Sequence, residues 1–330
     1  MSNRVRVAQF VGHSPFAPLM EQFIQEKLAC GYRYSVAASI LRRFDAFLCN
    51  QGLDRCELPR SLSWQWLAKR PHESANTQQS RISVIRRFAM YLCRLGYQAD
   101  VPNRALGAKP TTIFSPRILT HAEIQQLLDA VDRIVPDARA SPLRHLVMPE
   151  VFRLLYGCGL RVNEVLQLRV ADVDLGRGVL TVRGAKFGKD RLVPPALPLV
   201  QRLQKYAAEV GQRPADAYFF PSAHDGHWSI QGAYGLFRKL LWRCGISHGG
   251  RGRGPRIHDL RHTYAVHTLL RWYREGADLE AKLPLLATYL GHVSLEGTQQ
   301  YLHLTAELFP QIVVRANNAF GDVIPRRSES

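Results

Sequence analysis

The chain contains 330 residues, which is enough for a large buried core and about two domains. Hydrophobic residues make up 46% of it, a share typical of folded rather than disordered proteins. Lysine and arginine number 44 against 27 acidic residues, so the formal net charge is +17, and the surplus runs along the whole chain. A surplus of this size favours a polyanionic partner, such as nucleic acid, over a merely basic surface.

The sequence also disfavours several classes of protein. No stretch approaches the run of roughly 18 apolar residues that a membrane span needs, and the N-terminus lacks the apolar segment of a secretory signal. The six cysteines are scattered without a CxxC pair, which disfavours a zinc site and indicates reduced thiols in a cytoplasmic protein. No GxxxxGK motif is present, so we expect no ATP site.

The first third of the chain has the spacing of helices. Apolar residues recur every three or four positions over 15–30, 35–50, 63–68 and 74–95, which predicts a small all-helical bundle. The outer face of its last helix is predicted to carry four arginines: Arg81, Arg86, Arg87 and Arg94. This face either lines a groove for a ligand or is an ordinary solvated surface.

A proline-rich segment, residues 98–117, interrupts the helical pattern. Its prolines are Pro102, Pro110 and Pro116. Little apolar periodicity survives there, so we place a domain boundary in it, with one domain over 1–113 and another over 114–330. Directly after it, Thr120 and Glu123 have the spacing of a capping box, which predicts the start of a helix.

The second domain continues with an apolar run over 147–158 that predicts a buried segment. Glycines end this run, and Arg161 then stands at the start of a new helix. An arginine beside such a tight turn is costly to bury unless it meets an anion. The partner is therefore either a bound anion or an acidic neighbour such as Glu164 or Asp172.

Residues 179–183 and 191–194 have the spacing of two strands joined by a basic, glycine-containing turn. Four basic residues lie in or beside this turn: Arg183, Lys186, Lys189 and Arg191. Their clustering favours a phosphate contact over isolated, solvated side chains. Helical spacing follows over 197–210 and 229–243.

The C-terminal part of the chain concentrates the reactive side chains. His258 and Arg261 are three positions apart, so they share one face of a helix. A further helix is predicted over 283–290, with Pro284 in its first turn and Gly291 at its end.

His292 and Tyr301 follow that helix. Arginine offers planar donors matched to phosphate oxygens, and a tyrosine hydroxyl attacks as a nucleophile when its developing charge is stabilised. These parts indicate chemistry on a phosphate. The tail over 306–320 again has helical spacing.

Taken in order, these motifs resemble the tyrosine recombinases (phage integrase family), of the Xer and transposon type. The likeness runs over 118–310, and residues 15–97 are similar in type to the helical core-binding domain of those enzymes. It implies a mainly α fold with a small antiparallel β-sheet. Residues 1–113 would form a helical core DNA-binding domain, and 114–330 a mixed α/β catalytic domain with a C-terminal tail.

The resemblance implies six catalytic residues: Arg161, Lys186, His258, Arg261, His292 and Tyr301. Both arginines would hold the non-bridging oxygens of the scissile phosphate, and Tyr301 would attack it to leave a 3′-phosphotyrosyl link. The lysine would donate a proton to the leaving 5′-oxygen. His258 would assist proton transfer, and His292 would hydrogen-bond the phosphate.

The resemblance also implies partners. The chain would assemble as a tetramer on two double-stranded DNA sites, with the tail 306–320 docking on a neighbouring protomer; the sequence leaves accessory proteins open. No cluster of carboxylates surrounds the six positions, so we expect no metal ion and no other cofactor. Two departures from the family pattern are Asn163, where serine is common, and an apparent insertion over 272–282.

These expectations favour a site-specific recombinase that integrates, excises or resolves DNA, as in a mobile element. Three alternatives remain: a type IB topoisomerase that relaxes DNA, a DNA-binding accessory protein without catalysis, and a phosphatase for small substrates. The presence of all six positions disfavours the second, and the spread of positive charge disfavours the third.

Overall fold

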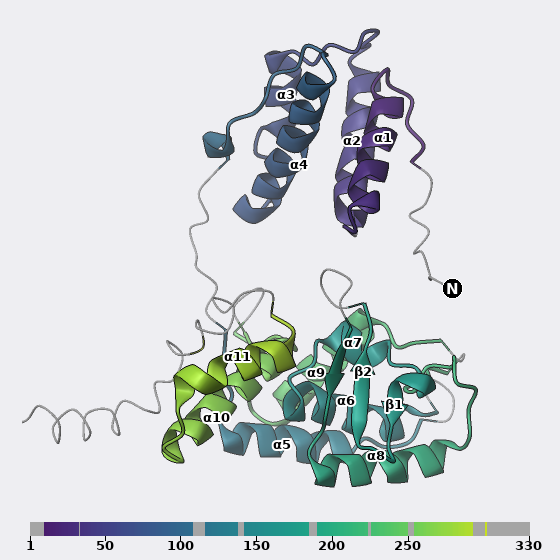
Figure 1. Ribbon diagram of the computed structural model, residues 1–330, viewed down its shortest axis with the longest axis vertical. Coiled ribbons are helices and arrows are strands. Elements are labelled where there is room, and N and C mark those ends of the chain that lie inside the picture. The colour runs from purple at the N-terminus through teal and green to yellow at the C-terminus, as the bar shows by residue number, and fades with distance from the viewer. Residues whose placement is uncertain are drawn as a thin grey trace, which may run out of the picture. The chain divides into compact units, whose positions relative to one another are not determined.

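The computed structural model describes residues 10–32, 34–107, 116–137, 142–184, 190–223, 226–249, 254–292 and 301 (Figure 1). The chain divides into two compact units, Met1–Phe114 and Ser115–Ser330, and the division falls inside the proline-rich segment. The predicted tail helix over 306–320 lies outside the described residues. Within the part of the chain that the structure describes, no helix is long and apolar enough to cross a bilayer.

The first unit consists of helices packed around an aromatic core. Its elements are α1 (Ala17–Ala29), α2 (Ser35–Asn50), α3 (Arg60–Leu67), α4 (Ala75–Arg94) and the short 3₁₀ helix η1 (Arg104–Leu106) (Figure 1). Phe23 and Phe88 pack ring to ring with centroids 5.7 Å apart, and Phe44 meets Trp66 at 5.0 Å. The four helices predicted from apolar spacing are confirmed.

Arg81 is not on the outer face of α4, so that prediction was wrong. Its side chain is 2% exposed, and its guanidinium donates to both carboxylate oxygens of Glu73, at 2.8 and 2.7 Å. It also donates to the backbone carbonyls of Trp66 and of Ala68, which lie at the end of α3. The helical spacing of α4 could not predict that Arg81 is buried, because the residues that cover it come from the preceding segment, at the end of α3 and at Glu73.

The second unit combines seven described helices, a further 3₁₀ turn and a small sheet. The helices are α5 (His121–Asp132), α6 (Arg144–Gly157), α7 (Val162–Leu166), α8 (Leu197–Val210), α9 (Ile230–Arg243), α10 (Asp259–Arg274) and α11 (Leu279–Leu290), and the 3₁₀ turn is η2 (Val170–Asp172). As predicted, Thr120 and Glu123 form a capping box at the start of α5. The mainly α fold with a small antiparallel sheet is thereby confirmed.

The sheet has three antiparallel strands in the order β1 (Val173–Asp174), β2 (Val179–Val182) and β3 (Arg191–Val193). Leu180 pairs with Val193, and both are buried, so one face of the hairpin packs on the core. The two-residue strand β1 was not predicted, because a strand this short leaves no alternation to detect.

Helix α6 lies inside this unit, in contact with α5, α8 and α10 (Figure 1). It is apolar almost all round, which is the pattern of a helix covered by neighbours on several sides. A separate cluster joins α10 to α11 through Val266, Leu269 and Leu290, and Tyr301 packs into it. These packings fix the two helices that carry the predicted catalytic histidines and Arg261.

Helix α11 begins at Leu279, four residues earlier than predicted, and Pro284 lies inside it rather than in its first turn. The start is set by Asp278, whose side chain accepts hydrogen bonds from the backbone N–H groups of Glu280 and Ala281. The apparent insertion over 272–282 is therefore the end of α10, a turn and the first turn of α11.

His267 on α10 joins three helices of this unit. Its Nδ1 is 2.9 Å from the Tyr156 hydroxyl of α6, and its ring stacks on His121 of α5 with centroids 3.8 Å apart. The side chain is buried, and burial together with the nearby His121 lowers the pKa of His267 to about 4. The neutral imidazole is thus the form that the fold accommodates.

We expect Arg81→Gln to destabilise the first unit by about 3 kcal/mol, because it leaves the buried Glu73 carboxylate without its cation. Urea unfolding measures the change. Arg94→Gln is the matched control, since Arg94 is 60% exposed and pairs with the partly exposed Glu26, so its loss should be much smaller. Equal losses for the two variants would contradict the buried pair.

We expect the second unit to lose stability as the pH falls from about 6.5 towards 4. The pKa of His267 is lowered on folding, so the unfolded chain binds a proton in this window and the folded protein does not. The measurement is the melting temperature at pH 7 and pH 5, and His267→Gln should shrink the difference. An unchanged difference in that variant would rule out His267 as a contributor.

Candidate active site

Arg261, in the first turn of α10, is the buried centre of the site. Its side chain is 1% exposed, and its guanidinium donates to the carbonyls of Gly159, at 2.8 Å, and Leu290, at 2.7 Å. Gly159 has φ +58°, and a Cβ there would lie 2.5 Å from the Tyr264 ring, so this turn requires glycine. Burial, with the charge of Arg161 adding to it, lowers the pKa of Arg261 to about 10.

Arg161 caps α7 directly after the glycine turn and is 30% exposed along its side chain. Its Nη1 donates to Glu164 Oε1 at 2.7 Å, and its Nη2 lies 3.4 Å from the Gly291 carbonyl. Of the two acidic neighbours considered above, Glu164 is therefore the partner, whereas Asp172 pairs with Arg183. The Arg161 side chain is thus more exposed than that of Arg261.

Glu164 accepts hydrogen bonds from two arginines at once. Its Oε1 also accepts from Arg191 Nη1 at 3.0 Å, while its Oε2 accepts from Arg191 Nη2 at 2.8 Å and from the Arg161 backbone at 2.9 Å. Burial alone would raise the pKa of Glu164, but the bonds from Arg191 and Arg161 lower it to about 2. The expectation that Arg191 faces a phosphate was wrong, because its side chain is 9% exposed and bound to Glu164.

Two histidines lie at the start of α10 and meet edge to face. The rings of His258 and His262 have centroids 4.8 Å apart at an angle of 86°. Burial is the main cause that lowers the pKa of both histidines to about 4. The charge of Arg261 lowers the pKa of His258 further, and His258 likewise lowers the pKa of His262. At neutral pH both imidazoles are therefore uncharged.

Tyr301 lies 1% exposed beside these rings. Its hydroxyl oxygen is 3.1 Å from His262 Nδ1, and its ring is 6.0 Å from that of His292 at an angle of 30°. Burial raises the pKa of Tyr301, and the positive charge of Arg261 opposes that rise. His262 was not among the predicted residues, although its position one turn after His258 places it on the same face of α10.

His292 follows the residue that ends α11. Gly291 adopts φ +70°, and a Cβ there would lie 3.0 Å from Arg191 Nη1, so this helix end also depends on glycine. The His292 backbone N–H bonds to the Ala287 carbonyl at 2.9 Å. Burial, then Arg261 and Arg161, lower the pKa of His292 to about 4.

The structure thus brings five of the six predicted residues into one electrostatic cluster: Arg161, His258, Arg261, His292 and Tyr301. They come from the start of α7, the start of α10 and the segment after α11. The sixth, Lys186, lies between β2 and β3 and outside the described residues.

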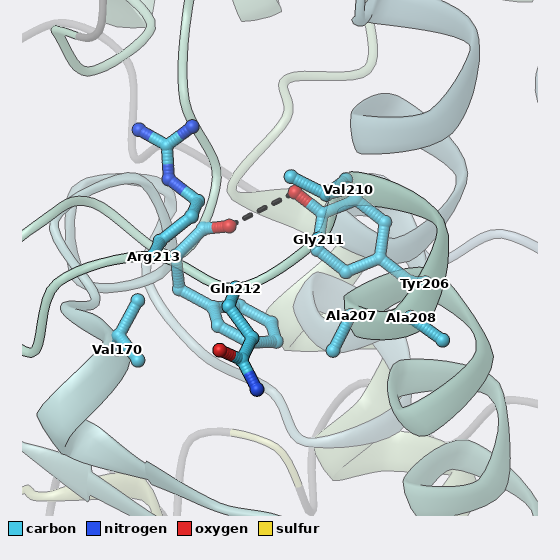
Figure 2. A pocket seen from close by; sticks show the side chains of 9 residues that line it. Val170, Tyr206, Ala207, Ala208, Val210, Gly211, Gln212 and Arg213 are labelled. Carbon is cyan, nitrogen blue, oxygen red and sulfur yellow. Dashed lines mark hydrogen bonds between the residues drawn. The ribbon is translucent and has the colours of Figure 1, made fainter.

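A separate hollow lies beside the C-terminal end of α8 (Figure 2). Apolar side chains such as Val170 and Val210 line it, and the Tyr206 hydroxyl donates to the Phe219 carbonyl at 2.9 Å. It shares no residue with the cluster around Tyr301, and its lining offers no pair of acid and base for catalysis.

Comparison with known proteins identifies the family of the chain. Residues 117–307 match the phage integrase family. The chain is 35% identical over 312 residues to the putative integrase/recombinase y4rE of Sinorhizobium fredii (strain NBRC 101917 / NGR234), covering 94% of this chain and 96% of that protein. It is 32% identical over 251 residues to tyrosine recombinase XerD of Ralstonia nicotianae (strain ATCC BAA-1114 / GMI1000), covering 74% and 75%.

Solved structures share the fold at lower identity. The integrase of transposon Tn1549 in complex with circular intermediate DNA superposes with a TM-score of 0.62 at 16% identity, over 88% of this chain and 95% of that one. The XerH site-specific recombinase bound to its difH substrate gives 0.58 at 18% identity, over 82% and 76%. With the family match and the relatives above, the chain belongs to the phage integrase family and is a tyrosine-type site-specific recombinase.

Proposed function

We propose that this recombinase cuts and rejoins double-stranded DNA through a 3′-phosphotyrosyl intermediate formed on Tyr301. The observation that carries the proposal is the placement of the Tyr301 hydroxyl 3.1 Å from an uncharged imidazole and in the field of Arg261 and Arg161. A phenol, a base and two cations are the parts that nucleophilic attack on a phosphodiester requires.

The two arginines act on the phosphate. Phosphoryl transfer collects negative charge on the equatorial oxygens, and guanidinium groups stabilise it with charge-assisted hydrogen bonds. Arg261 is bonded to two carbonyls and is buried, while the Arg161 side chain is 30% exposed. This difference supports one buried, fixed cation and one that is more accessible to the phosphate.

Tyr301 must lose a proton to attack, because burial raises its pKa above the usual value near 10. The neutral His262 accepts this proton as the bond from the phenol oxygen to phosphorus forms. His258, edge-on to His262, assists this transfer, and His292 donates a hydrogen bond to the phosphate. The bond from phosphorus to the 5′-oxygen then breaks, and Lys186 protonates that oxygen.

The phosphotyrosyl bond retains the free energy of the phosphodiester, so rejoining needs no nucleotide cofactor. A 5′-hydroxyl attacks the phosphorus and passes its proton back to Lys186, the phenol leaves, and the proton on His262 returns to Tyr301. This reversal, with a 5′-end from a second duplex, exchanges strands. We further propose that the protein works in the cytoplasm as a tetramer on two sites, in the transposition of a mobile element.

The first unit, residues 1–113, is proposed to bind DNA as a helical core-binding domain, and the second, 114–330, to carry the catalytic residues. A hollow between α2 and α4 is lined by three arginines and several amides and hydroxyls; the arginines are Arg86, Arg87 and Arg104. Guanidinium, amide and hydroxyl groups are the usual donors to DNA phosphates and base edges. The DNA-bound state of the Tn1549 integrase and of XerH supports a duplex as the partner.

We expect the wild-type protein to form a covalent adduct with nicked DNA, and Tyr301→Phe to form none, because phenylalanine lacks the attacking oxygen. The site is first selected from a pool of duplexes with a randomised central segment. A nicked duplex of the selected sequence then traps the adduct, which denaturing electrophoresis separates from free protein.

Each result of this experiment decides between functions. Wild-type binding without an adduct would show a DNA-binding protein without catalysis. If the protein forms adducts with supercoiled plasmids that lack the selected sequence and relaxes them, it is a type IB topoisomerase. An adduct with Tyr301→Phe would assign the nucleophile to another residue.

We expect His262→Gln to slow cleavage by about 100-fold at pH 7, because the phenol loses its proton acceptor. The deficit should shrink as the pH rises to 9, because the small ionised fraction of Tyr301 grows about tenfold per pH unit in the variant, while the wild-type rate levels off. Single-turnover adduct formation measures both profiles. His227→Gln, an exposed histidine elsewhere in the unit, is the matched control. Parallel profiles for His262→Gln and wild type would exclude His262 as the base.

A further inference from the structure

Arg191, the first residue of β3, uses its whole guanidinium inside the protein. Nη1 and Nη2 donate to the two oxygens of Glu164 at 3.0 and 2.8 Å, and Nε donates to the Tyr289 carbonyl at 3.0 Å. The side chain is 9% exposed. Each of its three nitrogens donates to a protein acceptor, so we look for the function of Arg191 in the groups that it holds.

The first group that it holds is the carboxylate that also binds Arg161. Glu164 carries one negative charge and stands between two guanidiniums, so this trio keeps one positive charge in excess. If Arg191 were absent, Arg161 would be the remaining arginine bonded to Glu164, and the charges of that pair would cancel.

The second group that it holds is the end of α11. Besides bonding the Tyr289 carbonyl, the guanidinium packs where a Cβ of Gly291 would lie, 3.0 to 3.2 Å from its atoms. The carbonyl of Gly291 in turn lies 3.4 Å from Arg161 Nη2, and His292 comes next in the chain. The Arg191 side chain therefore contacts both the carboxylate that binds Arg161 and the end of α11 that precedes His292.

We propose that Arg191 is a positioning residue for DNA cleavage: by occupying Glu164 and the end of α11, it leaves the charge of Arg161 free for the scissile phosphate. It does not touch the substrate. This role rests on the proposed function, since it needs a phosphate to be bound by Arg161.

The test compares Arg191→Gln, Arg191→Lys and the double variant Glu164→Gln with Arg191→Gln, using single-turnover adduct formation on the nicked duplex described above. We expect Arg191→Gln to slow cleavage by about 100-fold, because Glu164 then neutralises Arg161. Arg191→Lys keeps the charge without the fork, so its loss should be about tenfold. Duplex affinity should stay within about threefold in both, because Arg191 is buried.

The double variant gives the decisive readout. Removing the carboxylate's charge removes the need for Arg191, so this variant should cleave about tenfold faster than Arg191→Gln alone. A residue that merely stabilises the fold would instead give additive losses. Arg202→Gln is the matched control, because Arg202 likewise pairs with a buried carboxylate, that of Glu150, between α8 and α6. It should lower the melting temperature and leave the cleavage rate unchanged.

Several outcomes would overturn this role. A double variant as slow as Arg191→Gln, or equal slowing by Arg202→Gln, would reduce Arg191 to a stabilising residue. Wild-type rates in Arg191→Gln would remove the role and leave the proposed function standing. Absence of an adduct with the wild-type protein would overturn the proposed function and this role with it.

Discussion

The site depends on one buried cation, Arg261, whose two hydrogen bonds to carbonyls join segments that are far apart in the chain. Gly159 lies at the turn between α6 and α7, and Leu290 lies at the end of α11. A guanidinium is costly to bury, so this geometry persists only while both carbonyls remain in place. The same contacts therefore join distant segments of the second unit and hold the buried cation of the candidate site.

Neutral imidazoles around this cation follow from the same burial. His258, His262 and His292 all have a pKa near 4, because desolvation and the neighbouring arginines disfavour a further positive charge. Uncharged rings can accept a proton at neutral pH, whereas imidazolium rings could not. Burial of the histidines, with the charge of the neighbouring arginines adding to it, thus keeps their rings in the uncharged form that can accept a proton.

The sequence predicted the helices and most of the site because their signals are local or follow a fixed order. The ordered motifs that resemble the tyrosine recombinases pointed to residues between Arg161 and Tyr301 that lie together, and apolar periodicity located most helices. Partners set by tertiary folding gave no such signal. Arg81 was assigned to a surface because the turn that buries it comes from another segment, and Arg191 was assigned to a phosphate because its bond to Glu164 spans 27 positions.

The burial of Tyr301 has a consequence for when the protein can cut. An oxygen of a side chain that is 1% exposed cannot reach a phosphorus atom until the groups that cover it move. Its bond to His262 further stabilises the covered state. In the reaction proposed above, contacts with DNA would therefore have to supply the free energy that uncovers the phenol. The proposed nucleophile would then be kept from reacting in the free protein and become available where a duplex is bound.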